Sequence, residues 1–215
     1  MSFYEIGVVA HTGRSEQAWA MFESIHGRVI SLDDGTLGCN GNHIRVMTDL
    51  REWYPDAQWY VFLEDDAEPV EGFRRQLIEA LAYAPTDVVS LYLGTSNPVH
   101  WQPTIERTMA LSQDESWIVS DFLLHAVGYA INVDVIDDLV QFLNPFSRVP
   151  IDEQISTYCR YNSVRVSYTL PSLVDHKDGP TVIDRHADGA PRLLPRKAWR
   201  LGTREEWSSR SIELS

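Results

Sequence analysis

The feature that most constrains this chain is a short apolar run that ends abruptly in three consecutive acids. Residues 59–63 read Trp-Tyr-Val-Phe-Leu, which is the length of a fully buried strand. Glu64, Asp65 and Asp66 follow at once, and residues 69–83 then read as a helix. In open α/β sheets, ligands bind in the crevice outside the carboxyl ends of the strands. The three acids are therefore predicted to lie at a binding site.

The chemistry of that site follows from the charge of the acids. Three adjacent carboxylates repel one another, so a site that keeps all three ionised usually holds a cation. Oxygen ligands suit a hard divalent ion, Mg²⁺ or Mn²⁺, which can also hold a diphosphate. The alternative is a solvated acidic turn before a helix, where carboxylates also favour the helix dipole.

Strand-like and helix-like segments alternate along the chain. Strands are predicted at residues 4–10, 28–33, 59–63, 87–93, 117–120, 125–131 and 164–169, and helices at residues 15–26, 42–53, 69–83, 132–143 and from Pro150 onward. This alternation predicts a mostly parallel, helix-covered sheet, with partly antiparallel strands after residue 94. The loop at residues 94–103 offers Asn97, His100 and Trp101, which could line a cleft for sugar or base rings.

Charge is unevenly distributed between the body of the chain and its end. The net charge is −13, yet residues 191–215 carry six Arg and Lys against three Glu. We predict one domain at residues 1–190 and a basic C-terminal tail at residues 191–215. The acidic body does not attract nucleic acid by its overall field. The tail could fold over a diphosphate, bind a polyanion such as DNA with Trp199 between bases, or remain a solvated docking segment.

Cysteine usage and hydropathy bear on the compartment. Cys39 and Cys159 lie far apart with no metal-type spacing, so a disulfide framework is not expected and a reducing, cytoplasmic setting fits. No apolar run approaches the length of a membrane span, and the N-terminus does not read as a signal peptide. No pattern indicates the oligomeric state.

Several short motifs occur in an order that resembles a known family. Residues 37–39 read Leu-Gly-Cys with His43 four positions after the cysteine, and this resembles the "GC..SH" segment of glycosyltransferase family 25, with Asn42 in place of the usual Ser. That group includes bacterial lipooligosaccharide galactosyltransferases and procollagen galactosyltransferases. Further segments are similar to its acidic, DXD-like motif (residues 63–66), its "GYxI" strand (128–131), its "P-x-D" element (150–152) and its closing "PxLV" (168–174).

The resemblance spans about residues 4–180 and carries expectations about fold and function. It implies a GT-A fold, which is Rossmann-like, with helices on both faces of a mostly parallel sheet and a small antiparallel extension. It also implies a nucleotide-sugar donor, UDP-linked in our reading, and Mn²⁺ or Mg²⁺. The expected activity is hexosyl transfer, with inversion, to a hydroxyl of a saccharide, a protein glycan or a hydroxymethylated DNA base, the last as in a small phage-type DNA-modification enzyme.

The resemblance also suggests roles for individual residues. Asp66 is expected to bind the metal, and His176, which follows the last predicted strand, is expected to return to it; the alternative is an ordinary loop histidine. Asp65 would face the donor ribose or sugar, and Glu64 would orient the site. Asp152 is expected to act as the base that takes the acceptor hydroxyl's proton, unless it only caps its helix or compensates the helix dipole.

Three further residues near the first strand end are candidate donor contacts. His11, Arg14 and His43 could bind uracil, ribose or phosphate. Arg14 could equally be a helix-surface residue, and His43 a core histidine with satisfied hydrogen bonds.

Two other functions compete with glycosyl transfer. A sugar nucleotidyltransferase normally carries a Gly-rich, basic phosphate loop near its first strand, and only Gly13 and Arg14 are available there. A non-catalytic nucleotide- or carbohydrate-binding module could keep the same fold and bind a nucleotide without turnover.

Overall fold

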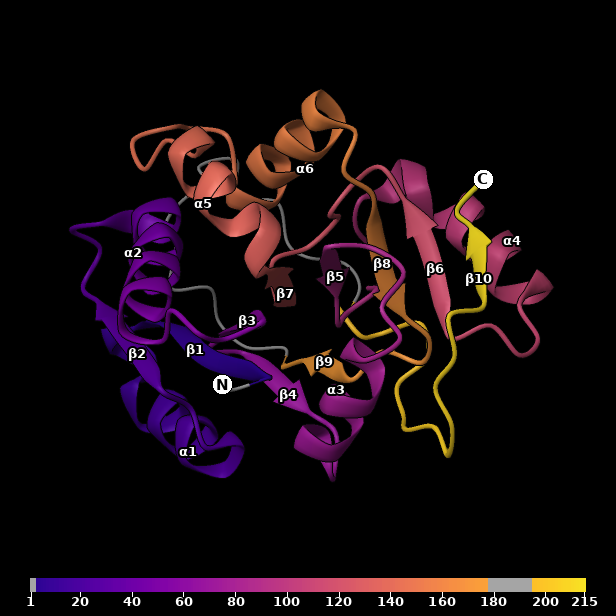
Figure 1. Cartoon of the computed structure of the whole chain (residues 1–215), viewed down its shortest axis with the longest axis horizontal. Coiled ribbons are helices and arrows are strands. Elements are labelled where there is room, and N and C mark those ends of the chain that lie inside the picture. Colours follow the sequence, from indigo (N-terminus) through magenta and orange to yellow (C-terminus); the bar gives the residue numbers. More distant parts are fainter. Residues whose placement is uncertain (1–2, 178–194) are drawn as a thin grey trace.

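A central sheet of eight strands runs through the part of the chain that the computed structural model describes, residues 3–177 and 195–215 (Figure 1). The order of its strands is β10-β6-β8-β5-β7-β3-β1-β2, and a separate pair, β4-β9, lies beside it. The strands are β1 (Tyr4–His11), β2 (Val29–Asp33), β3 (Trp59–Glu64), β4 (Ala67–Pro69), β5 (Val88–Ser90), β6 (Trp117–Ser120), β7 (Gly128–Asn132), β8 (Val166–Thr169), β9 (Val174–His176) and β10 (Ser211–Glu213). The helices are α1 (Ser15–Ile25), α2 (Gly38–Trp53), α3 (Phe73–Leu81), α4 (Gln102–Leu111), α5 (Val133–Phe142) and α6 (Ile151–Asn162), with short 3₁₀ turns η1 (Thr12–Arg14) and η2 (Val99–Trp101).

The directions of the strands decide where a binding site can lie. β2, β1 and β3 are mutually parallel, so their carboxyl ends meet at one edge of the sheet. β7 is antiparallel to both β3 and β5 and separates the first three strands from the second half of the sheet. This arrangement confirms the predicted α/β class and is consistent with a GT-A-like fold, with the antiparallel strands in the second half as expected.

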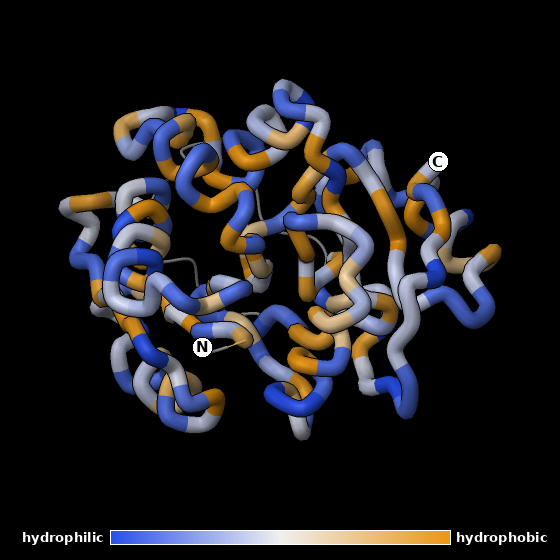
Figure 2. Tube along the Cα trace, in the orientation of Figure 1, coloured by the Kyte–Doolittle hydropathy of each residue, from blue (hydrophilic) through white to orange (hydrophobic). Residues whose placement is uncertain are grey.

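Helices cover both faces of the sheet because the strands are apolar on both sides. One face packs against α2, α4, α5 and α6, and the other against α1 and α3 (Figure 1). The central strand β3 is buried along residues 59–63, as its uninterrupted apolar run predicts. Hydrophobic stretches follow the strands, and hydrophilic ones alternate with them along the outer helices (Figure 2).

Local signals account for several helix starts. The Asn132 side chain accepts a hydrogen bond of 3.1 Å from the Asp134 amide and caps α5, as predicted. α2 begins at Gly38 rather than at residue 42. The reason is that the Asp33 carboxylate, at the end of β2, accepts hydrogen bonds from the amides of Leu37 and Gly38 and stabilises an earlier first turn.

The segment after the acids differs from the prediction. Residues 69–83 were expected to be one helix, but residues 67–69 form β4, which pairs antiparallel with β9, and α3 begins only at Phe73. The residue before it, Gly72, has φ of +69°, a conformation that glycine adopts without strain. Pairing with a strand more than a hundred residues later overrides the helical pattern there. Helix α4 likewise starts at Gln102, inside the segment expected to be a loop.

The C-terminal segment is part of the domain. The predicted boundary at residue 190 lies outside the described residues, but residues 195–215 pack on the sheet, and β10 extends it by pairing with β6. Trp207 is 5% exposed; its ring packs 5.5 Å from that of Trp117, and its Nε1 donates to Gln76 Oε1. These residues are therefore not a solvated tail. In the described part of the chain, no helix is long and apolar enough to cross a membrane.

The packing of Trp207 predicts how much the last segment contributes to stability. Replacing Trp207 by alanine should lower the free energy of unfolding by about 3–5 kcal/mol, because a large buried ring is removed. Trp53, which is 58% exposed at the end of α2, is the matched control, and its alanine variant should change stability by about 1 kcal/mol or less. Urea unfolding followed by circular dichroism measures both. Equal stabilities of the two variants would contradict an integrated C-terminal segment.

Candidate functional site

A cleft of about 450 Å³ opens at the carboxyl ends of β1, β2 and β3. It is lined by the last residues of these strands, by the residues that follow them, and by the first turns of α2. This is the edge at which the order of parallel strands places a ligand site. The charged and titratable side chains that line the cleft include His11, Arg14, Asp33, Glu64, Asp65 and Asp66.

Arg14 bridges two of the three acids. Its Nη1 lies 2.7 Å from Asp65 Oδ1 and 2.8 Å from Asp66 Oδ2. Only 16% of the Arg14 side chain is exposed, so the alternative of a helix-surface residue does not describe it. The guanidinium of Arg14 thus neutralises much of the negative charge that was predicted to need a metal ion.

Asp65 is held rigidly at the floor of the cleft. One carboxylate oxygen accepts from the His11 amide at 2.7 Å and the other from Arg14. Its backbone is fixed as well, because its amide donates to the Val9 carbonyl and its carbonyl accepts from the Gln17 side chain. Burial raises the pKa of Asp65, although the hydrogen bonds from His11 and Arg14 oppose that rise. His11 and Asp65, both predicted to be donor contacts, do lie side by side at the cleft.

Asp66 and His176 are brought together by the pairing of β4 with β9. His176 Nε2 lies 3.3 Å from Asp66 Oδ2. Burial would raise the pKa of Asp66, but hydrogen bonding to His176 and the charges of His176 and Arg14 outweigh it and lower the pKa to about 2. Because this pKa lies below the unfolded value, the pairing stabilises the fold above about pH 4 and is lost as the pH falls towards 2.

One oxygen of Asp66 is available to a cation. Oδ1 is buried and has no hydrogen-bond partner among the described residues. A buried carboxylate oxygen without a donor is unfavourable unless something pairs with it. A carboxylate oxygen is the ligand type that Mn²⁺ and Mg²⁺ prefer, and the His176 imidazole, 3.3 Å from the other oxygen of Asp66, is the second candidate ligand.

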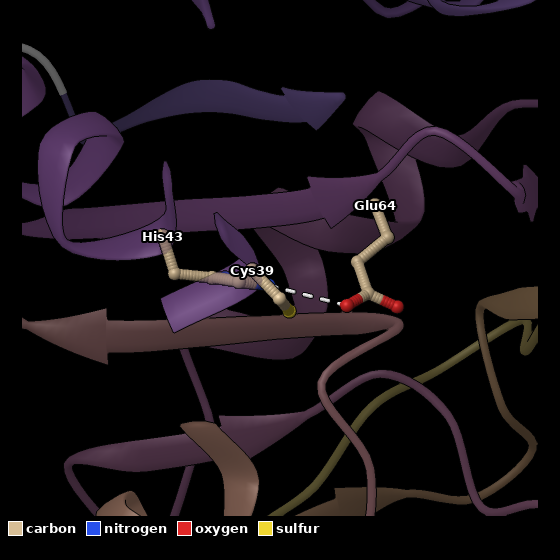
Figure 3. Close-up of side chains that lie close together, drawn as sticks. All are labelled: Cys39, His43 and Glu64. Atoms are coloured by element: carbon tan, nitrogen blue, oxygen red, sulfur yellow. Dashed lines mark hydrogen bonds and ion pairs between the residues drawn. The ribbon is translucent and has the colours of Figure 1, made fainter. Parts of the chain in front are cut away.

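The Glu64 side chain points towards Cys39 and His43 of α2 (Figure 3). His43 Nε2 lies 3.1 Å from Glu64 Oε1, and its Nδ1 lies 2.9 Å from the Tyr129 hydroxyl. Burial opposes protonation of His43, but its interactions with Cys39 and Glu64 outweigh burial and raise its pKa to about 10. The His43 ring is completely buried and does not line the cleft, as expected for a core histidine with satisfied hydrogen bonds.

Asp152 lies at the start of α6, close enough to Glu64 for their charges to interact. Burial and the negative charges of Glu64 and Glu153 raise its pKa to about 7, although the Glu153 amide donates to it. A carboxyl group with a pKa near neutrality can accept a proton without being too weak a base. Asp152 thus lies near Glu64, at the carboxyl end of β3, but neither Asp152 nor His176 is among the residues that line the cleft.

Some residues fall elsewhere than expected. Trp101 packs against Phe122, 5.1 Å between ring centres, and neither it nor Asn97 or His100 lines the cleft. Asp33 lines the cleft and was not anticipated, although its position at the end of β2 follows the same strand-end rule as the acids of β3.

The basic C-terminal segment reaches the neighbourhood of Asp66. Lys197 Nζ donates to the His176 carbonyl at 2.8 Å and to Glu68 Oε2 at 3.2 Å, and it also lies 3.2 Å from Asp175 Oδ2. The β4-β9 pair is thereby tied to a segment from the far end of the sequence.

The Arg14 bridge yields a stability prediction. Arg14→Ala leaves Asp65 and Asp66 without their cation and should lower the free energy of unfolding by roughly 3 kcal/mol, the lower end of the range for broken buried ion pairs. Excess Mg²⁺ should restore part of this loss, because the ion can take the place of the guanidinium. Arg51→Ala is the control: Arg51 pairs with Asp137, which is 57% exposed, so the expected loss is about 1 kcal/mol or less. Equal losses in both variants, measured by urea unfolding, would contradict the role given to Arg14.

No family model matches the chain, and no curated protein matches it. Among solved structures, the protein A197 from STIV gives a TM-score of 0.47 at 10% sequence identity, covering 81% of this chain and 86% of that chain. A glycosyltransferase involved in the glycosylation of the major capsid of PBCV-1 gives a TM-score of 0.37 at 10% identity, covering 74% of this chain and 76% of that chain. Similarity of this degree assigns the chain to no family.

Proposed function

We propose that this protein is a metal-dependent glycosyltransferase that moves a sugar from a nucleoside-diphosphate sugar, UDP-linked in our reading, to an acceptor hydroxyl with inversion. One observation carries the proposal. Asp65 and Asp66 line a cleft of about 450 Å³ at the carboxyl ends of three parallel strands, and His176 pairs with Asp66. The carboxyl group of Asp152, whose pKa is raised to about 7, lies close enough to Glu64 of the same cleft for their charges to interact. The volume of the cleft is in the usual range for small-molecule sites.

The diphosphate is best placed beside Asp66 rather than at the start of α2. A helix N-terminus often binds phosphate through its first amides. Here the Asp33 carboxylate already accepts from the Leu37 and Gly38 amides, so these donors are occupied. This also argues against a nucleotidyltransferase that cradles phosphates on such a turn.

Asp66 and His176 would hold the divalent ion. Bound there, Mn²⁺ or Mg²⁺ would neutralise the charge that develops on the leaving diphosphate. Arg14 would keep Asp65 and Asp66 ionised and in place for the donor, and Asp65 would face the ribose or the sugar. Asp152 would take the proton of the acceptor hydroxyl as that oxygen attacks the anomeric carbon.

A neutral saccharide or protein glycan is favoured as the acceptor over modified DNA. Several basic side chains of the C-terminal segment already pair with groups of the same chain. Lys197 pairs with Glu68 and Asp175, Arg204 donates to backbone carbonyls, and Arg210 pairs with Asp114. Basic side chains that are already paired contribute little to the attraction of a polyanion. A polyanion would also have to approach the rest of the chain, which is acidic.

A second candidate, a nucleotide-binding module without turnover, is favoured by the Arg14 bridge. If Arg14 alone satisfies the acids, the cleft can bind a nucleotide without a metal ion. Metal dependence separates the two functions.

The proposal is tested by thermal shift with UDP-, GDP- and CMP-sugars, each with and without Mn²⁺. Hydrolysis of the sugar donor that stabilises the protein most is then measured. We expect stabilisation by one donor class, larger with Mn²⁺, and Mn²⁺-dependent hydrolysis. His176→Ala should need a higher Mn²⁺ concentration for the same effect, whereas His26→Ala, which alters a histidine at the end of α1, should not. Binding without hydrolysis would support the module. An unchanged Mn²⁺ titration in His176→Ala would remove that residue from the metal site.

Asp152 is tested separately from donor binding. Asp152→Asn should keep the donor-induced thermal shift and lose about 100-fold or more of the transfer rate, because the amide cannot accept the proton. Turnover of the wild type should rise with pH up to about 7 and then level off, since Asp152 must be ionised to act. Asp134→Asn, which alters an acid in the first turn of α5, controls for the helix dipole. Normal turnover in Asp152→Asn would exclude Asp152 as the base.

A further inference from the structure

We propose that Cys39, His43 and Glu64 form a binding site for a thiophilic divalent ion such as Zn²⁺, separate from the Asp66–His176 pair. Cys39 and His43 lie one turn apart on α2, and Glu64 is the last residue of β3 (Figure 3). The sequence does not show this grouping, because the third ligand comes from another element. The inference does not depend on the proposed transferase activity.

The distances suit one ion. One donor atom from each residue can be chosen so that all three lie within 4.8 Å of one another, and His43 Nε2 lies 3.1 Å from Glu64 Oε1. In a tetrahedral zinc site, bonds of about 2.0–2.3 Å place neighbouring ligand atoms roughly 3.3–3.8 Å apart. Cys39 and Glu64 are only partly buried, so their side chains have room to rotate towards that spacing.

His43 is already oriented for such a role. Its Nδ1 lies 2.9 Å from the hydroxyl of Tyr129, which is fully buried on β7, and the two rings stack with centres 5.8 Å apart. Metal-binding histidines characteristically use the second ring nitrogen for such a hydrogen bond, which holds the first nitrogen towards the ion. Tyr129 is therefore a positioning residue in this site.

The choice of ion follows from the ligands. A thiolate, an imidazole and a carboxylate together suit Zn²⁺, whereas Mg²⁺ and Mn²⁺ prefer oxygen ligands. Cys39 lies in the first turn of α2, one turn before His43. Cys39 and Glu64 also line the cleft, so an ion can enter from there and keep a ligand position directed towards it.

Cobalt spectroscopy on the full chain tests the site, because Co²⁺ bound to a thiolate gives a sulfur-to-metal charge-transfer band. Metal-free wild type titrated with Co²⁺ should develop this band with one equivalent, and Zn²⁺ should abolish it. Cys39→Ser should not develop it. Cys159→Ala, which removes the other cysteine, and Asp66→Asn, which alters the other candidate metal site, should both keep it.

Zn²⁺ affinity, measured by competition with a chromophoric chelator, shows how much each residue contributes to metal binding. We expect Cys39→Ser and Glu64→Gln to weaken binding by at least about 100-fold and Tyr129→Phe by about 10-fold, the latter being typical of a lost hydrogen bond to a ligand. Cys39→Ser and Glu64→Gln alter partly exposed side chains, so they should fold, which circular dichroism checks. Absence of the cobalt band in wild type, or an unchanged Zn²⁺ affinity in Cys39→Ser, would show that the three residues form only a hydrogen-bonded cluster.

Discussion

The cleft depends on the contact between the Arg14 guanidinium and the carboxylates of Asp65 and Asp66. Two adjacent, largely buried acids repel each other and lose most of their hydration, so they stay ionised only beside a positive charge. Arg14 supplies that charge from the turn after β1, at 2.7 and 2.8 Å. The acidic strand end is thus stable in the protein alone, and a metal ion would add to an arrangement that already exists.

The three consecutive acids contact different parts of the protein because the chain turns sharply after β3. Glu64 faces α2 and His43, Asp65 is held by the turn after β1, and Asp66 meets His176 on β9. Under the two proposals, hard and soft metal ions would bind at separate places near one cleft. Asp66 and His176 would hold an ion that binds a diphosphate, whereas Cys39, His43 and Glu64 would hold an ion that prefers sulfur.

Much of the fold was predictable because the signals were local. The apolar run of β3, the cap at Asn132 and the start of α6 after Pro150 all agree with the structure. The parts that were missed depend on partners distant in sequence. β4 exists because β9 pairs with it, and residues 195–215 belong to the domain because β10 pairs with β6 and Trp207 is buried. No pattern within either segment indicates such a partner.

By itself, the sequence determined that acids end a central strand at the ligand-binding edge of an α/β sheet, because strand length follows from local hydrophobicity and the fold class from the alternation of strands and helices. Only the tertiary structure decided what those acids contact. Arg14 lies 51 positions before Asp65, and His176 more than a hundred positions after Asp66, so their charges meet only when the chain folds. Electrostatic interactions depend on distance in space, and a sequence records only distance along the chain.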